Sequence, residues 1–196
     1  ISGISSRLSH DYTKRGVRLL CIALALTVVT AVIMPMMNFE GAEIYFGILH
    51  LLSLSMLIFS ALRAGLDKIN PIVGFVLCIV IYILTYGVSA GFVGIAGLKT
   101  FALPAALYKT NYFMPLGFFN SSFHSADYFP LLPHLFMFLA GTFIGIYAAN
   151  GRFPAFTYRR RSRALCFLGR HALVIYIAHQ PVIFGILWVV EKIIAK

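Results

Sequence analysis

The sequence predicts an all-α fold, a polytopic bundle of transmembrane helices, from its composition and from the length of its apolar segments. Hydrophobic residues make up 60% of the 196 residues and charged residues 11%, with a mean hydropathy of +0.89. A soluble domain carries roughly a quarter charged residues, and a core of this size cannot hide so much apolar surface. We therefore expect lipid to surround most of the chain.

Apolar segments recur at the length needed to cross a membrane, because about 20 helical residues span the hydrocarbon layer. We expect a single transmembrane domain, residues 1–196, with about five spans, at approximately 17–37, 44–62, 71–87, 130–149 and 165–190.

Local signals support these spans. The first ends near Pro35, the second carries His50 among several serines, and the third starts at Asn70-Pro71. The fourth contains Gly141 and Gly145, a spacing that lets two helix backbones approach closely. We expect these glycines to pack against another helix.

Residues 89–129 contain no clear span and many aromatic residues, interrupted by Pro104 and Pro115. Aromatic side chains favour the boundary between membrane and water. We expect an interfacial or partly re-entrant cap with one or two short helices.

The formal charge of +10 does not indicate nucleic-acid binding, because most basic residues fall in short loops between apolar spans. Alternating the sides places most of the Lys and Arg residues, including the loop 150–163, on one side. The positive-inside rule makes that side cytoplasmic. We expect a multi-pass protein of the cell membrane with a cytoplasmic N-terminus and an extracytoplasmic C-terminus.

Several classes of site have no support in the sequence. The three cysteines lack the spacing of a disulfide framework or a metal knuckle, and we find no zinc spacing, Walker A loop or GxSxG elbow.

The chain opens at Ile1 without an initiator Met. We interpret Ile1–Ser9 as the end of a preceding helix and expect that an upstream part is missing.

The last span carries His179, Gln180 and Pro181 near the middle of its length. An ionisable group at that depth costs about 2.5 kcal/mol or more unless it faces a partner or a water-filled cavity. Pro181 removes one backbone donor and leaves the carbonyl of Ile177 without its usual partner. We predict a functional role for His179.

His50 and Asp127 are two further candidates, each with an alternative structural role. His50 is either a packing histidine or a proton carrier that lines a cavity, with Ser53 one turn away to hold its ring. Asp127 either caps the fourth span or orients a histidine or substrate.

Residues near the two membrane faces complete the candidates. His134 is either an interfacial residue or, with Tyr128 and Gln180, part of a substrate site, whereas we expect His124 to be solvated. Four arginines near the last span either set topology and bind anionic lipid or bind a phosphate-bearing donor. These are Arg159, Arg160, Arg161 and Arg170.

Three segments, Phe46–Leu62, Phe123–Gly145 and Leu168–Leu187, contain the patterns FGILH, ADYFPLLP and IYIAHQP. Together they resemble the compact bacterial members of the heparan-alpha-glucosaminide N-acetyltransferase-type membrane acyltransferases. The resemblance implies a bacterial inner-membrane enzyme that moves an acyl group, most simply acetyl, from acyl-CoA to an acceptor such as a sugar. It also implies no bound cofactor, acyl-CoA as cosubstrate, and catalytic roles for the two histidines and the aspartate named above.

The chain departs from the family at its start, where the family's first helices and a further histidine are absent. Two other functions remain open: a small proton-coupled transporter with His50 and His179 as relay groups, and a non-catalytic membrane subunit. No internal inverted repeat supports the transporter. The partners we expect are the lipid bilayer, acyl-CoA, a small or glycan acceptor and, optionally, further copies of the chain, but no nucleic acid.

Overall fold

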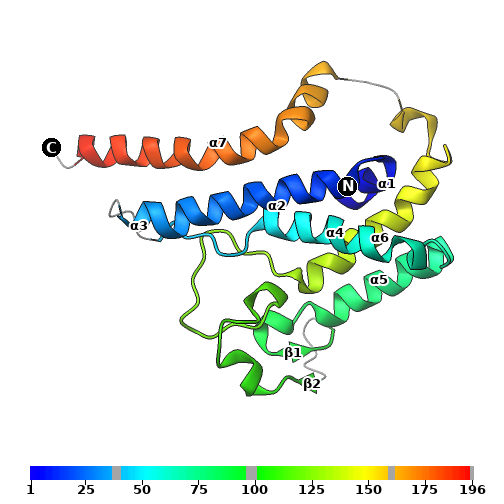
Figure 1. Cartoon of the computed structure of the whole chain (residues 1–196), viewed down its shortest axis with the longest axis horizontal. Helices are drawn as coiled ribbons and strands as arrows, with labels where there is room; N and C mark the ends of the chain where they lie inside the picture. Colours follow the sequence, from blue (N-terminus) through cyan, green and yellow to red (C-terminus); the bar gives the residue numbers. More distant parts are fainter. Residues whose placement is uncertain (37–40, 96–100, 159–161, 195–196) are drawn as a thin grey trace. The chain divides into compact units, whose positions relative to one another are not determined.

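A computed structural model describes residues 1–36, 41–95, 101–158 and 162–194 (Figure 1). The chain divides into two compact units, Ile1–Arg152 and Phe153–Lys196. Helices dominate both units, which confirms the predicted all-α class. Whether the two units form a single transmembrane domain stays a prediction.

The first unit is built from helices that pack in pairs. Helix α2 packs against α4, α5 against α6, and α1 against α6 (Figure 1). Helix α2 continues through a π-helical turn, Val29–Ile33, into the short α3. The helices of the first unit are α1 Ser2–Leu8, α2 Tyr12–Val28, α3 Met34–Met36, α4 Ile48–Leu66, α5 Pro71–Thr85 and α6 Leu131–Ala149.

Four helices in the described part of the chain are long and apolar enough to cross a membrane. They cover Tyr12–Met36, Ile48–Leu66, Pro71–Ala90 and Leu131–Ala149, close to four of the predicted spans. Large apolar side chains on the outer sides of α2 and α5 are exposed, such as Leu24 at 52% and Val73 at 59%. Such surfaces suit lipid, which agrees with a membrane protein.

Glycines allow α1 to lie directly on α6. A Cβ atom on Gly145 would lie 2.7 Å from the Cβ of Arg7, and one on Gly141 would lie 3.3 Å from the Cα of Gly3. A Cβ on Gly3 would in turn meet the backbone of α6 at the carbonyl of Phe138. The prediction that Gly141 and Gly145 pack against another helix is therefore confirmed. That helix is α1, at the start of the chain, where the sequence also predicted a helix.

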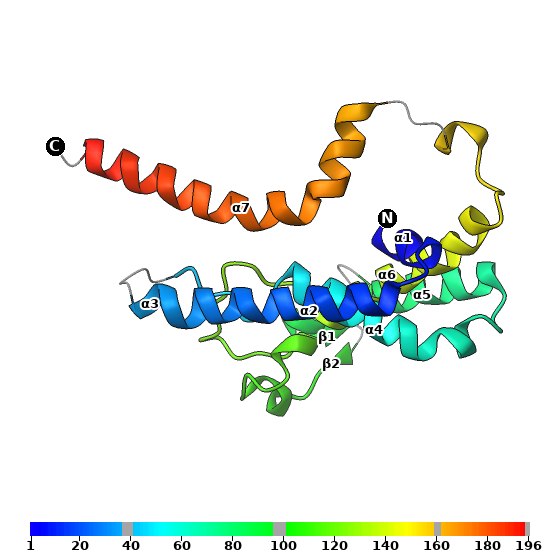
Figure 2. The same cartoon turned by 45° about the horizontal axis from the view of Figure 1, so that its top comes forward.

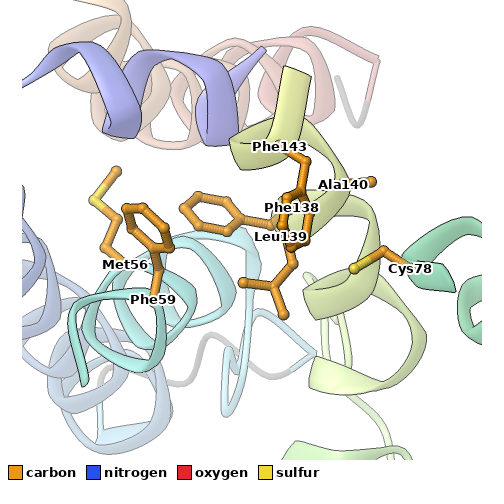
Figure 3. Close-up of a cluster of buried hydrophobic side chains, with 7 residues drawn as sticks. All are labelled: Met56, Phe59, Cys78, Phe138, Leu139, Ala140 and Phe143. Carbon is orange, nitrogen blue, oxygen red and sulfur yellow. The ribbon is translucent and has the colours of Figure 1, made fainter. Parts of the chain in front are cut away.

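The core of the first unit lies where α4, α5 and α6 meet (Figure 3). The side chains in Figure 3 come from all three helices. Phe59 and Phe143 are fully buried there, at 0% and 1% exposure. The cluster comprises Met56, Phe59, Cys78, Phe138, Leu139, Ala140 and Phe143.

The aromatic segment between α5 and α6 contains more structure than the one or two short helices predicted. Three 3-10 helices occur among its described residues, Val88–Ala90, Ala105–Tyr108 and Met114–Leu116. Two short antiparallel strands also pair there, β1 Phe92–Val93 and β2 Phe101–Ala102 (Figure 2). We call residues 88–130 the cap; its position at the membrane surface stays a prediction.

The second unit contains a 3-10 helix, Ala155–Thr157, and the long helix α7, Arg163–Ile194. Helix α7 has 32 residues, more than the roughly 20 that a span requires. It includes the predicted last span, 165–190. The number of spans in the whole chain stays a prediction.

Candidate active site

Two extended segments, 43–46 and 125–129, pair beside the start of α4. The amide of Ala126 donates to the carbonyl of Glu43 at 2.8 Å, and that of Phe129 donates to the carbonyl of Phe46 at 3.1 Å. The helix begins at Ile48, a few residues after the approximate start predicted for the second span at residue 44, because residues 43–46 pair with segment 125–129. The bounds of that span stay a prediction.

Asp127 caps the start of α4. Its Oδ2 accepts a hydrogen bond from the amide of Ile48 at 3.1 Å, which satisfies one of the free donors of the first turn. A Cβ atom on Gly47 would lie 2.9 Å from the Asp127 Cγ and nearer still to Oδ2. The small residue before the helix is what lets the carboxylate reach the backbone.

Sequence reasoning offered Asp127 as a cap for the fourth span, which is α6, and this alternative is wrong. The residue before α6 is Pro130, which has no capping side chain. The pairing of segments 43–46 and 125–129 instead carries Asp127 to α4, which no local sequence signal reveals.

His50 lies in the first turn of α4 and is buried, at 5% exposure. Its Nδ1 accepts from the amide of Gly47 at 3.4 Å, and its Nε2 lies 3.3 Å from the Thr27 Oγ1. The amide can only donate, so the neutral ring carries its proton on Nε2 and donates it to Thr27. The ring also stacks on Phe46, with 5.4 Å between centroids.

The ring of His50 is held by Thr27 rather than by Ser53. The Ser53 hydroxyl donates to the backbone carbonyl of His50 at 2.9 Å, so the prediction that it holds the imidazole is wrong. Thr27 comes from α2, which packs against α4. Sequence reasoning missed it because nothing in the sequence pairs the two helices in this register.

A second threonine of α2 fixes the segment that leads into α4. The Thr30 Oγ1 donates to the carbonyl of Leu26 at 2.9 Å and accepts from the amide of Ile44 at 3.1 Å. Thr30 belongs to the π-helical turn, an irregularity that often occurs at functional sites. Thr27 and Thr30, three residues apart on one helix, could have been noticed as a polar pair.

Tyr128 lies in the cap beside Asp127. Its hydroxyl donates to the carbonyl of Met114 at 2.6 Å, and burial raises the pKa of this phenol above its ordinary value. Tyr128 also lines a cavity of about 410 Å³. A substrate-binding role for Tyr128 stays a prediction.

His134 lies at the start of α6, where it makes packing contacts. Its Nδ1 donates to the carbonyl of Pro130 at 3.0 Å. The edges of Phe129 and Tyr82 contact its ring, with centroids 5.6 Å and 6.4 Å away. Both alternatives for His134, an interfacial position and a substrate-binding role, stay predictions.

The structure brings His50, Asp127 and Tyr128 together in the first unit, whereas His179 lies in the second. Within α7, the Nδ1 of His179 donates to the carbonyl of Tyr176, and their rings lie 5.2 Å apart. Arg170 also belongs to α7. The predictions for Arg159, Arg160, Arg161 and the Gln180 and Pro181 side chains fall outside the described residues.

A family model supplies the context for this geometry. The model of the catalytic domain of heparan-alpha-glucosaminide N-acetyltransferase matches residues 1–181. The chain belongs to this family. The family match covers the paired segments, the start of α4 and the part of α7 that carries His179.

Membership in this family confirms the resemblance found in the sequence and places the chain among membrane enzymes of the acetyltransferase type. Neither the comparison with curated proteins nor the comparison with solved structures gives a match. Roles for individual residues of this family member therefore rest on the geometry described above.

Proposed function

We propose that this protein is an integral-membrane acyltransferase that moves an acyl group, most simply acetyl, from acyl-CoA to an acceptor such as a sugar. The acceptor would lie on the extracytoplasmic side or in the membrane. The observation that carries the proposal is the buried His50 ring in the same helix turn that the Asp127 carboxylate caps. Family membership supports the acetyltransferase class of the reaction.

His50 would act as the general base. A neutral imidazole takes up a proton at its unprotonated nitrogen, here Nδ1. The Gly47 amide holds that nitrogen by a contact of 3.4 Å, which is long for a hydrogen bond and can be exchanged for an acceptor N–H or O–H. The acceptor would lose its proton to Nδ1 as it attacks the thioester carbon of acyl-CoA. The C–S bond would then break, and the imidazolium would return the proton to the departing CoA thiolate.

Asp127 would stabilise the imidazolium that results. Its carboxylate interacts electrostatically with His50, and an opposite charge in a site of low polarity favours a cation. The hydrogen bond from Ile48 fixes the carboxylate in place. Asp127 thus combines a capping role with an electrostatic one.

The remaining roles extend the same proposal to α7 and the loop before it. His179 and Gln180 would supply polar groups at membrane depth. Arg159, Arg160, Arg161 and Arg170 would bind the phosphates of acyl-CoA, since guanidinium groups match phosphate geometry. Donor would enter from the cytoplasmic arginine side and acceptor from the cap side, where Tyr128 and His134 would contact it.

This arrangement requires a multi-pass protein in the cell membrane, with its N-terminus in the cytoplasm and its C-terminus outside. Assembly of several copies is compatible with it. Incubation of the purified protein in liposomes with radiolabelled acetyl-CoA and glucosamine tests the activity. We expect label on the acceptor and its loss in His179→Ala, with helix content unchanged by circular dichroism.

Two outcomes would count against the proposal. Full transfer by His179→Ala would remove that residue from the mechanism. Solute flux into the liposomes without any acyl donor, together with no transfer, would favour a carrier instead.

A further inference from the structure

Two hollows lie side by side in the first unit where the cap meets the segment before α4. Their volumes are about 490 Å³ and about 410 Å³, and both are lined by Glu43, Phe123 and His124. Tyr45 lines the larger hollow and Tyr128 the smaller. We call the two together the Glu43 hollow.

The Glu43 hollow lies on one face of segment 43–46, and the opposite face carries Phe46, which stacks on His50. Side chains of an extended segment point alternately to its two faces. Ile44 and Phe46 face the interior, at 1% and 4% exposure, whereas Tyr45 is 41% exposed. Glu43 and Tyr45 therefore share the face that lines the hollow.

Aromatic rings form one wall of the hollow. Phe123 contacts Tyr45, Phe119 and Tyr128, with centroids 6.0, 5.2 and 5.1 Å away. Phe119 and Tyr128 also meet, edge to face, at 5.2 Å. These contacts hold the four rings as one cluster beside a carboxylate.

Two polar side chains in the hollow, those of Glu43 and His124, form no hydrogen bond or ion pair within the described part of the chain. Glu43 forms no salt bridge with any described residue, and its contacts with segment 125–129 go through its backbone carbonyl. The His124 ring likewise makes no hydrogen bond to another described residue. Both side chains are therefore available to a ligand.

We propose that the Glu43 hollow binds a small molecule with an organic ammonium group. The Glu43 carboxylate would pair with the cation, and the faces of Tyr45 and Phe123 would attract it through their ring electrons. His124 would hydrogen-bond a polar substituent such as a hydroxyl. The inference goes beyond the proposed function, because it assigns a binding site whether or not an acyl group is transferred.

Equilibrium binding to the full chain in detergent, without any acyl donor, tests this site. The probes are glucosamine and choline, with neutral N-acetylglucosamine for comparison. We expect at least one of the two cations to bind, and Glu43→Gln to weaken that binding about tenfold or more. Binding of glucosamine alone would identify a primary amine as the ligand group, and of choline alone a quaternary one.

Asp11→Asn is the matched control, because it removes one negative charge from an exposed pair with Lys14 at 3.7 Å. It should bind like the wild type. Tyr45→Leu is a second variant that weakens the aromatic wall and should also reduce affinity. Failure of both cations to bind, or equal binding by the Glu43→Gln, Tyr45→Leu and wild-type proteins, would overturn the proposal even if acyl transfer is observed.

Discussion

The Asp127 Oδ2 accepts a hydrogen bond from the amide of Ile48 at 3.1 Å. The first turn of α4 is therefore capped by a side chain that lies 79 residues further along the chain. This bond joins the two parts of the chain on which the proposed chemistry depends. It also makes the stability of α4 depend on a side chain of the cap.

Replacing Asp127 should separate its two roles. Asp127→Ala removes the cap and should lower the free energy of unfolding by about 1 kcal/mol. Asp127→Asn keeps an oxygen that can accept from Ile48, so its stability should change less, while loss of the charge should slow acyl transfer. Unfolding in mixed micelles and the transfer rate, measured on both variants, check this. Equal rates for Asp127→Asn and wild type would remove the electrostatic role.

Gly47 should not tolerate a side chain, since its Cβ would overlap the Asp127 carboxylate. Gly47→Ala should cost about 1–3 kcal/mol of stability, as overpacking does. Gly65→Ala on the same helix is the control, because its Cβ would meet nothing within 4 Å. Alanine favours a helix over glycine, so this variant should be as stable as the wild type or more so. If both variants are equally stable, the close approach of Asp127 is wrong.

The length and hydropathy of the apolar segments made the helices predictable, but the site depended on pairing between distant residues. Ile44 and Phe46 are apolar and continue the hydrophobic run of α4, so composition alone could not reveal that they are extended. The contacts of Thr27 and Asp127 with α4 depend on tertiary packing across 23 and 79 residues. His50 and Asp127 were predictable because burying a polar group among apolar residues costs free energy and therefore indicates a role. Glu43 and His124 lie in loops, where polar residues are common and indicate no site.

Arg7 and Asp67 should contribute to stability through an ion pair between α1 and the end of α4. The Arg7 side chain is 7% exposed and pairs with Asp67, whose side chain is 44% exposed. The Arg7 Cζ also lies 5.4 Å from the centre of the Phe59 ring. Asp67→Asn should destabilise the protein by about 1–3 kcal/mol, because a nearly buried charge loses its partner. Asp11→Asn breaks an exposed pair and should change stability little. Thermal unfolding that shifts equally in both variants would contradict a stabilising role for the pair of Arg7 and Asp67.

Tyr128 should make stability fall at alkaline pH. Burial raises its pKa in the folded state, whereas the unfolded phenol titrates near its ordinary value of about 10. The unfolded state therefore loses its proton first, and stability that is present below about pH 10 is lost as pH rises further. Tyr128→Phe should reduce this loss, at a cost of about 1 kcal/mol near neutral pH for the bond to Met114.

Alkaline titrations of the unfolding midpoint check this prediction. Tyr112→Phe is the control, because Tyr112 is 88% exposed and should leave the alkaline profile unchanged. An identical profile for Tyr128→Phe and the wild type would show that Tyr128 ionises as readily in the folded state as in the unfolded one.

The most direct test of the central claim is the rate of acyl transfer from acetyl-CoA by His50→Gln. Glutamine can still bond to the Gly47 amide and to Thr27, but it cannot take up a proton from the acceptor. We expect a rate at least about 100-fold below that of the wild type, with the helix content and unfolding midpoint preserved. A His50→Gln protein that transfers acetyl at the wild-type rate would contradict the assignment of His50 as the base.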